Sequence, residues 1–214
     1  MKIQNIILAM IISLLFGCSS TRKAMIPTGE NIKEIAIHNA ILDFSSNTRL
    51  FRKDSIFFVS FSDTLHTFAL KRVDERTRRW EVDRVYEDIV TVRISVHRIC
   101  VECVECTDRF LYTARTTIGS KGGTLPTRHI IKDNKLFYWW DDDYPLTKEM
   151  LAVLWKFDLL CDDTEGLIQM PEFTTDNRLK GAHYYFCRND LSRFRRVITN
   201  IGLGFYRPPR LRCR

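Results

Sequence analysis

The stretch SIFFVSFSDTLHTFALKRVDERTRRWEVDRVYEDIVTVRISV (residues 55–96) decides the fold class of this chain. Its apolar residues alternate with polar ones, or run together, over strand lengths, and short polar breaks separate the early segments. Breaks this short suit hairpins, because a parallel crossover needs about a dozen residues or more. The stretch therefore predicts an antiparallel meander with strands at Ser55–Phe61, Leu65–Val73, Arg79–Tyr86 and Ile89–Val96.

Helical spacing lies on both sides of this stretch. An apolar stripe predicts a first helix over residues 31–43, formed by Ile32, Ile35, Ala36 and Ala40. Thr147 is a suitable N-cap for a second helix. The apolar face of that helix comprises Met150, Val153, Leu154, Phe157, Leu160 and Cys161. Both helices are amphipathic, so we expect them to pack on the sheet.

Further strand signals follow the meander. Phe110–Ile118 has strand character, and residues 129–140 suggest a hairpin around the polar turn KDNK. AHYYFC (residues 182–187) is typical of a strand, whereas DLSRFRRVITN (residues 190–200) fits a short helix or a strand. Together these signals predict an α+β fold, with a mostly antiparallel sheet and helices packed on one face.

The N-terminus has the layout of an export signal. Lys2 precedes an apolar run of 11 residues from Ile6 to Phe16, interrupted at Ser13. A helix that spans a bilayer needs about 20 apolar residues, so this run is too short to be one. A positively charged start followed by a short apolar run is typical of a secretory signal peptide.

Leu15-Phe16-Gly17-Cys18 comes at the end of that run and resembles the bacterial lipobox. The resemblance implies that Cys18 receives a diacylglyceryl group and becomes the first residue after cleavage. Each buried methylene adds about 0.8 kcal/mol, so two or three acyl chains would hold the protein at a membrane. The alternative is an ordinary secretory signal in which Cys18 is incidental.

These features predict three segments: a lipoprotein signal peptide (1–17), a lipidated cysteine with a tether (18–30) and a single globular domain (31–214). A hydrophobic content of 45%, with 14 Phe, favours a packed globular chain over a disordered one. The layout is similar to that of envelope lipoproteins of Gram-negative gut anaerobes, a likeness that implies no activity. Ser19 stands where an aspartate often marks inner-membrane retention, which favours the outer membrane.

Basic residues are concentrated at the C-terminus. Residues 178–214 contain ten Lys and Arg and one acidic residue, Asp190. Such a segment could contact an anionic lipid headgroup, an anionic envelope polymer or a protein partner, with the candidate side chains Arg207, Arg210, Arg212 and Arg214. Export excludes nucleic acid as the expected partner. The alternative is that these side chains form an ordinary solvated surface, because basic residues that are close in sequence need not face one partner in the folded protein.

Six cysteines remain besides Cys18, namely Cys100, Cys103, Cys106, Cys161, Cys187 and Cys213. An even number in an exported protein favours disulfides, and a Cys187–Cys213 bond would pin the C-terminus. The spacing of Cys100, Cys103 and Cys106 leaves a metal or redox site as an alternative. It departs from the ferredoxin pattern, which needs a cysteine where Phe110 stands. On a strand these three thiols would also point to different faces.

The segment FYWWDDDY (residues 137–144) places aromatic rings beside three carboxylates. Rings that stack on sugars and acids that hydrogen-bond or catalyse are what glycan binding or cleavage needs. The candidate glycan-binding residues are Tyr138, Trp139, Trp140, Asp141, Asp142 and Asp143. The alternative, which we favour, is that the rings pack on the two sides of a sheet and the aspartates form a solvated turn.

No catalytic motif stands out. The chain lacks H-E-x-x-H, G-x-S-x-G and the phosphate-binding G-x-x-x-x-G-K-[ST] pattern. Its histidines are scattered, at His38, His66, His97, His129 and His183. We therefore expect no catalytic residue, no cofactor and no metal. The sequence favours a membrane-anchored protein with a non-enzymatic binding or scaffolding role, and leaves glycan binding or cleavage and cysteine-based redox or metal chemistry as alternatives.

Overall fold

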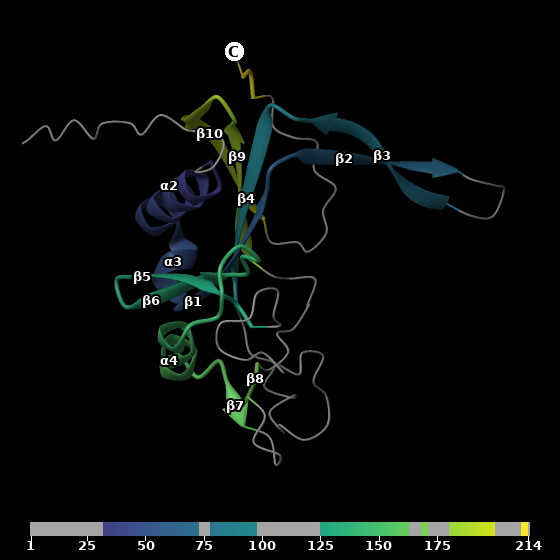
Figure 1. Cartoon of the computed structure of the whole chain (residues 1–214). Coiled ribbons are helices and arrows are strands. Elements are labelled where there is room, and N and C mark those ends of the chain that lie inside the picture. Colours follow the sequence, from purple (N-terminus) through teal and green to yellow (C-terminus); the bar gives the residue numbers. More distant parts are fainter. Residues whose placement is uncertain are drawn as a thin grey trace, which may run out of the picture.

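The computed structural model describes residues 32–72, 78–97, 125–162, 168–170, 180–199 and 211–213, which form an α+β structure (Figure 1). The helices are α2 (Ile32–Asn47), α3 (Arg49–Lys53) and α4 (Lys148–Lys156). The strands are β1 (Ile56–Ser62), β2 (Leu65–Arg72), β3 (Arg78–Tyr86), β4 (Ile89–Val96), β5 (Arg128–Lys132), β6 (Lys135–Trp139), β7 (Cys161–Asp162), β8 (Ile168–Gln169), β9 (Gly181–Cys187) and β10 (Asp190–Thr199).

Six strands form one mixed sheet in the order β10-β9-β4-β1-β6-β5. Its neighbouring strands are antiparallel except for β1 and β6, which run parallel. The expected α+β fold with a mostly antiparallel sheet is therefore confirmed. Strand β4 lies between β1 and β9, and its β-branched residues suit a central position. The buried ones on its helix-covered face are Val90, Val92, Ile94 and Val96.

Of the predicted sequential meander, the β2–β3 hairpin is confirmed, whereas the expected pairing of β1 with β2 and of β3 with β4 is wrong. Strand β1 pairs with β4, with Phe57 opposite Val96, while β2 and β3 pair only with each other. The reason lies in burial, because a strand in the middle of the sheet loses contact with water on both faces. Strand β3 carries the charged residues Glu81, Asp83 and Arg84, which would be costly to bury without partners. Strand β4 is apolar at every second position and takes the central place instead.

One face of the sheet is covered by α2 and α3. The rings at its centre pack closely, with centroids 4.8 Å apart for Phe57 and Phe137 and 5.1 Å apart for Phe44 and Phe57. Phe51 from α3 stacks on Phe57. Burying aromatic side chains removes large apolar areas from water, so this cluster contributes strongly to the stability of the fold. Its members from α2 are Ala36, Ile37, Ala40, Ile41 and Phe44.

The other face carries α4 at the β5–β6 end of the sheet. Successive residues of β6 point to opposite faces. Phe137 and Trp139 therefore join the α2 side, whereas Leu136 and Tyr138 join Met150 of α4. In Figure 1, α2 and α3 lie above strands β5 and β6, and α4 lies below them. The expected packing of all helices on one face is not confirmed, since the two hydrophobic clusters occupy opposite faces.

Two local predictions are confirmed. The KDNK segment forms the tight turn between β5 and β6, with positive φ angles of 50° at Asp133 and 61° at Asn134. Both angles suit the type I′ turn of two-residue hairpins, and these residue types tolerate the left-handed region. Thr147 caps α4, because its hydroxyl accepts the backbone N–H of Met150 at 3.1 Å. The segment at residues 190–200, for which the sequence allowed a helix or a strand, contains the strand β10.

Helix α2 is also tied to β9 and β10 by polar contacts. The Tyr184 hydroxyl donates to the Asp43 carboxylate at 3.0 Å, and Arg196 forms an ion pair with the same carboxylate oxygen. Asn39 donates to the backbone carbonyl of Leu191 at 3.1 Å. Burial, followed by the charge of Asp43, raises the pKa of Tyr184 well above its usual range, so this hydroxyl stays protonated and donates.

Strands β2 and β3 form an arm that projects from the six-stranded sheet (Figure 1). We call this hairpin, Leu65–Arg72 with Arg78–Tyr86, the arm. Its register shifts between Thr67 and Phe68, so that one residue of β3 is bulged out. A two-stranded hairpin is marginally stable alone in water, and it gains stability when a third element covers one of its faces.

Candidate functional site

The aromatic and acidic segment expected to bind glycans lies mostly inside the protein. Tyr138 and Trp139 are 0% and 5% exposed, and Asp141 is 5% exposed. Trp140 is partly buried between the rings of Phe58 and Tyr138. Asp142 and Asp143 are exposed. Two of the three predicted rings are therefore not available to stack on a sugar.

Ion pairs connect this segment to the start of α2. The Lys33 ammonium lies 2.8 Å from the buried Asp141 carboxylate. Arg128 pairs with Glu34 at 2.8 Å, and the Tyr144 hydroxyl donates to the same Glu34 oxygen at 3.1 Å. These contacts place the first turn of α2 against the loop after β6. The cluster has the chemistry of a structural clamp, with every charge paired.

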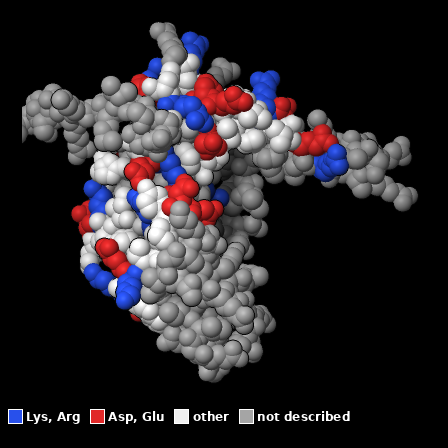
Figure 2. All heavy atoms as spheres, viewed as in Figure 1, with Lys and Arg blue, Asp and Glu red and all other residues white. Residues whose placement is uncertain are grey.

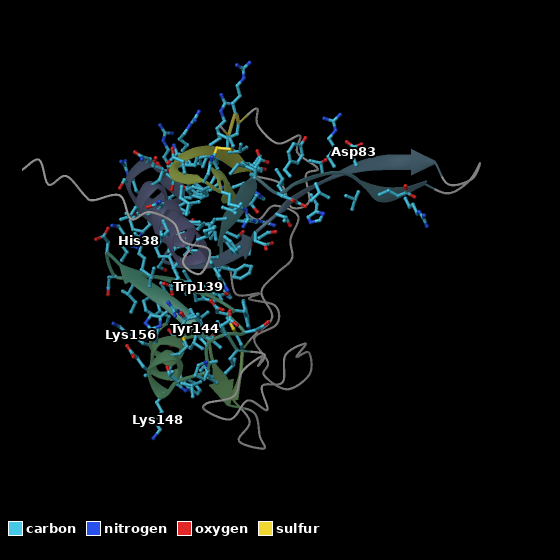
Figure 3. The ribbon with its side chains drawn as sticks, turned by 45° about the horizontal axis from the view of Figure 1, so that its top comes forward. His38, Asp83, Trp139, Tyr144, Lys148 and Lys156 are labelled. Atoms are coloured by element: carbon cyan, nitrogen blue, oxygen red, sulfur yellow. A yellow bond between two sulfur atoms is a disulfide. The ribbon has the colours of Figure 1, made fainter. Side chains whose placement is uncertain are left out.

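Tyr144 is the remaining aromatic residue of the segment and is 38% exposed. The Arg128 guanidinium lies 3.8 Å from the centre of its ring, a cation–π contact, and 5.9 Å from that of Trp139. Figure 3 shows Trp139 and Tyr144 near each other, with Asp83 far away on the arm. The ring face of Tyr144 that contacts Arg128 is thus occupied, which further weakens the case for sugar stacking.

The cysteines divide into a described pair and others. Cys187, at the end of β9, forms a disulfide with Cys213, 26 residues later in the sequence. This bond joins residues 211–213 to the sheet. Cys161 begins β7. Cys18, Cys100, Cys103 and Cys106 lie outside the described residues, so lipidation and the alternative metal or redox site stay predictions.

Of the four candidate arginines in the basic C-terminal segment, the structure describes Arg212, whose side chain is exposed. Arg207, Arg210 and Arg214 lie outside the described residues. Positive and negative side chains are interspersed over the described part of the face seen in Figure 2. Charge on this face therefore does not single out one anionic docking site.

A buried polar pair lies where the sheet meets the α4 side. His97 is 8% exposed, and its Nδ1 lies 2.5 Å from the Tyr138 hydroxyl. Burial lowers the pKa of His97 to about 4 and raises that of Tyr138 well above its usual range. Both groups are neutral at pH 7. A neutral pair sealed in the core acts as a packing element rather than as an acid or base.

The arm presents apolar surface to solvent. Val82 and Val85 are each 49% exposed. Their cross-strand partners are Phe68 and His66, which are two residues apart on β2 and therefore on one face of the hairpin. The bulge thus brings both valines to the same face, although their own spacing would separate them.

A second candidate lies on the sheet face opposite α2, where polar residues from neighbouring strands meet. Arg93 of β4 is opposite Ser60 of β1 and His183 of β9. Thr91 and Ser95 lie two residues away along β4 on the same face. We call these five residues the arginine strip. They belong to neither hydrophobic cluster, and four are partly buried while Ser95 is 4% exposed.

The part of the chain that the structure describes contains neither a candidate metal site nor a helix suited to span a membrane. Within these ranges, no group of three or more His, Cys, Asp or Glu is arranged to hold a metal ion. Among the described helices, none combines the length and apolar character that a bilayer crossing requires.

Comparisons with known proteins give no family for this chain. No protein-family model, no curated protein and no solved structure matches it. The function of this chain is therefore inferred from its own sequence and structure.

The sequence analysis predicted neither the exposed apolar face of the arm nor the arginine strip. A lone Arg93 in IVTVRISV looks like the solvent side of a strand, and its neighbours Ser60 and His183 are distant in sequence. The two strands of the arm were expected in the main sheet, because alternation of apolar and polar residues identifies a strand but not the strand with which it pairs. The charged residues of β3 were the available signal that this strand lies away from the core.

Proposed function

We propose that this protein is an envelope lipoprotein, anchored through Cys18 in the outer membrane, that binds a partner protein without catalysis. The anchor part of the proposal is supported by the signal-like residues 1–17 and the lipobox resemblance at Leu15–Cys18. The clamp at Lys33 and Glu34 is consistent with this role, because it fixes the first turn of α2 directly after the proposed tether.

The arm is the observation that carries the binding role. It projects from the body, and Val82 and Val85 expose about half of their surfaces on one of its faces. Exposed apolar side chains grouped on one projecting element are typical of interaction sites. A partner that covers this face would add the second layer that a two-stranded hairpin lacks.

The charge of the arm favours an acidic protein partner. Its two strands contain five basic residues, Lys71, Arg72, Arg78, Arg79 and Arg84, against Glu81 and Asp83. A second copy of the chain would bring like charges together. Insertion into a membrane is disfavoured because Lys71 and Arg72, at the end of β2 beyond the valines, would have to enter first.

The anchor is tested by the intact mass of the protein purified from its own envelope. The expected mass is that of a chain starting at Cys18 with a lipid adduct. Cys18→Ala should lose both the adduct and the membrane association. An unmodified Cys18 in the mature protein would contradict the anchor.

The partner is tested by placing a photocrosslinking amino acid at Val82 in intact envelopes. Ile131 of β5, 42% exposed and away from the arm, is the matched control position. We expect one crosslinked acidic protein from position 82 and none from position 131, with less product at high salt because exposed charge pairs are screened. A product of twice the chain mass, a lipid adduct or equal products at both positions would contradict the proposal.

A further inference from the structure

The arginine strip contains a guanidinium group in which one buried N–H donor has no hydrogen-bond acceptor. Arg93 Nε is buried and donates to no acceptor. None of the ion pairs among the described residues includes Arg93. A buried donor without a partner costs about 1–3 kcal/mol, so proteins rarely leave one without a reason.

The described strand neighbours of Arg93 are polar but not acidic. Its cross-strand neighbours are Ser60 and His183, and Thr91 and Ser95 flank it along β4. Burial is what lowers the pKa of Arg93, and burial and the Arg93 charge lower that of His183 to about 4. His183 is therefore neutral at pH 7. The strip thus holds one positive charge, the Arg93 guanidinium, with hydroxyl and imidazole groups around it.

An oxyanion is the group that fits this arrangement. The planar guanidinium fork matches the two oxygens of a carboxylate or phosphate, and charge-assisted hydrogen bonds of this kind are the stronger ones. The hydroxyl of Ser60 and the ring of His183 could complete the contacts. Partial burial strengthens the attraction, because the local dielectric is lower than in water.

An apolar neighbourhood adjoins the strip. Phe58 is two residues before Ser60 and therefore on the same face of β1. Its ring centroid lies 5.3 Å from that of Trp140, and both rings are partly buried. A ligand whose oxyanion is held by Arg93 can therefore lay an apolar part towards these rings.

We propose that Arg93, with Ser60 and His183, forms a binding site for the carboxylate or phosphate group of a small ligand that also carries an apolar part. The arm and the lipid anchor play no part in this site, so it is independent of the function proposed above.

Side-chain nitrogen NMR tests the proposal directly on the full chain in detergent micelles. The Nε–H signal of Arg93, assigned by its loss in Arg93→Lys, is followed during titrations with benzoate, phenyl phosphate and inorganic phosphate. We expect a saturable shift with at least one of the two aromatic anions, and the stronger of them identifies carboxylate or phosphate as the preferred group. Saturation by inorganic phosphate alone, or no shift with any probe, would overturn the proposal.

Variants separate this site from a general anion effect. Arg93→Met should weaken binding of the preferred anion at least tenfold, and His183→Gln should weaken it to a lesser degree. Arg195→Gln, which removes an exposed arginine on β10, should change binding less than twofold. Equal losses in Arg93→Met and Arg195→Gln would contradict a specific site.

Stability without ligand gives a second readout. If Arg93 is kept for a ligand, replacing its unpaired charge by the similarly long apolar side chain in Arg93→Met should raise the urea midpoint of unfolding. A lower midpoint would show that the guanidinium serves the fold itself, and would overturn the proposal even if the variant were too unstable for titration.

Discussion

Acidification from pH 7 to pH 4 is expected to destabilise the fold through His97. The ring is 8% exposed and lies 2.5 Å from the Tyr138 hydroxyl. Burial lowers its pKa to about 4, whereas a histidine in the unfolded chain has a pKa of about 6.5. Between these values the unfolded state binds more protons than the folded state. The contribution of His97 to the free energy of unfolding is therefore present above about pH 6.5 and is lost as the pH falls towards 4.

The size of the loss follows from the two pKa values of His97. Proton linkage gives a decrease in the free energy of unfolding of about 2 kcal/mol at pH 5 and about 3 kcal/mol at pH 4, relative to pH 7. His183 acts in the same direction, because burial and the charge of Arg93 lower its pKa to about 4. Its ring is partly exposed, so solvent screening makes its contribution smaller.

The assay is urea denaturation of the full chain at several pH values between 7 and 4.5, followed by circular dichroism. His97→Gln keeps a polar group near Tyr138 and cannot titrate, so this variant should lose about 2 kcal/mol less than the wild type between pH 7 and pH 5. His66→Gln, on the exposed part of the arm, is the control and should keep the wild-type slope. Equal acid sensitivity of the wild type and His97→Gln would refute the reasoning.

Three further predictions concern stability at neutral pH. Asp43→Ala leaves the buried Tyr184 hydroxyl without its acceptor and should cost about 1–3 kcal/mol in urea denaturation, with an unchanged denaturant slope. In Gly181→Ala the new Cβ would lie 2.7 Å from the Ile94 carbonyl oxygen, so thermal unfolding should show a loss of about 1–3 kcal/mol, and an unchanged midpoint would mean that β9 can move. Cys213→Ser opens a disulfide that spans 26 residues and should cost about 3 kcal/mol, and a reductant should then lower the urea midpoint of the wild type by more than that of the variant.

Local features of the fold could be predicted because neighbouring residues determine them. The turn at Asp133 and Asn134 depends on two consecutive backbone conformations, and the start of α4 depends on the Thr147 hydroxyl reaching the N–H of Met150. Strand identity in residues 55–96 followed from alternation and from β-branched and aromatic composition. The first helix was also predicted, although it extends to Asn47 rather than to residue 43.

The candidate sites were predicted less well, because the exposure of a side chain depends on what covers it. Tyr138 and Trp139 belong to an alternating strand in either interpretation of FYWWDDDY, and only packing on both faces of β6 shows that they are buried. The Cys187–Cys213 disulfide was expected from export and the even number of cysteines. The structure contains it because β9 and residues 211–213 lie side by side.

By itself, the sequence determined most of the longer strands and the two longer helices, where one hairpin turns and where one helix begins, since these choices depend on a few residues in succession. Only the tertiary structure decided that β1 pairs with β4 and β6, that β2 and β3 leave the sheet as an arm, and that Ser60, Arg93 and His183 meet. The physical reason is that strand pairing and burial are settled by competition among distant segments for the same core. Alternation along a strand records the faces of that strand, but not its neighbours.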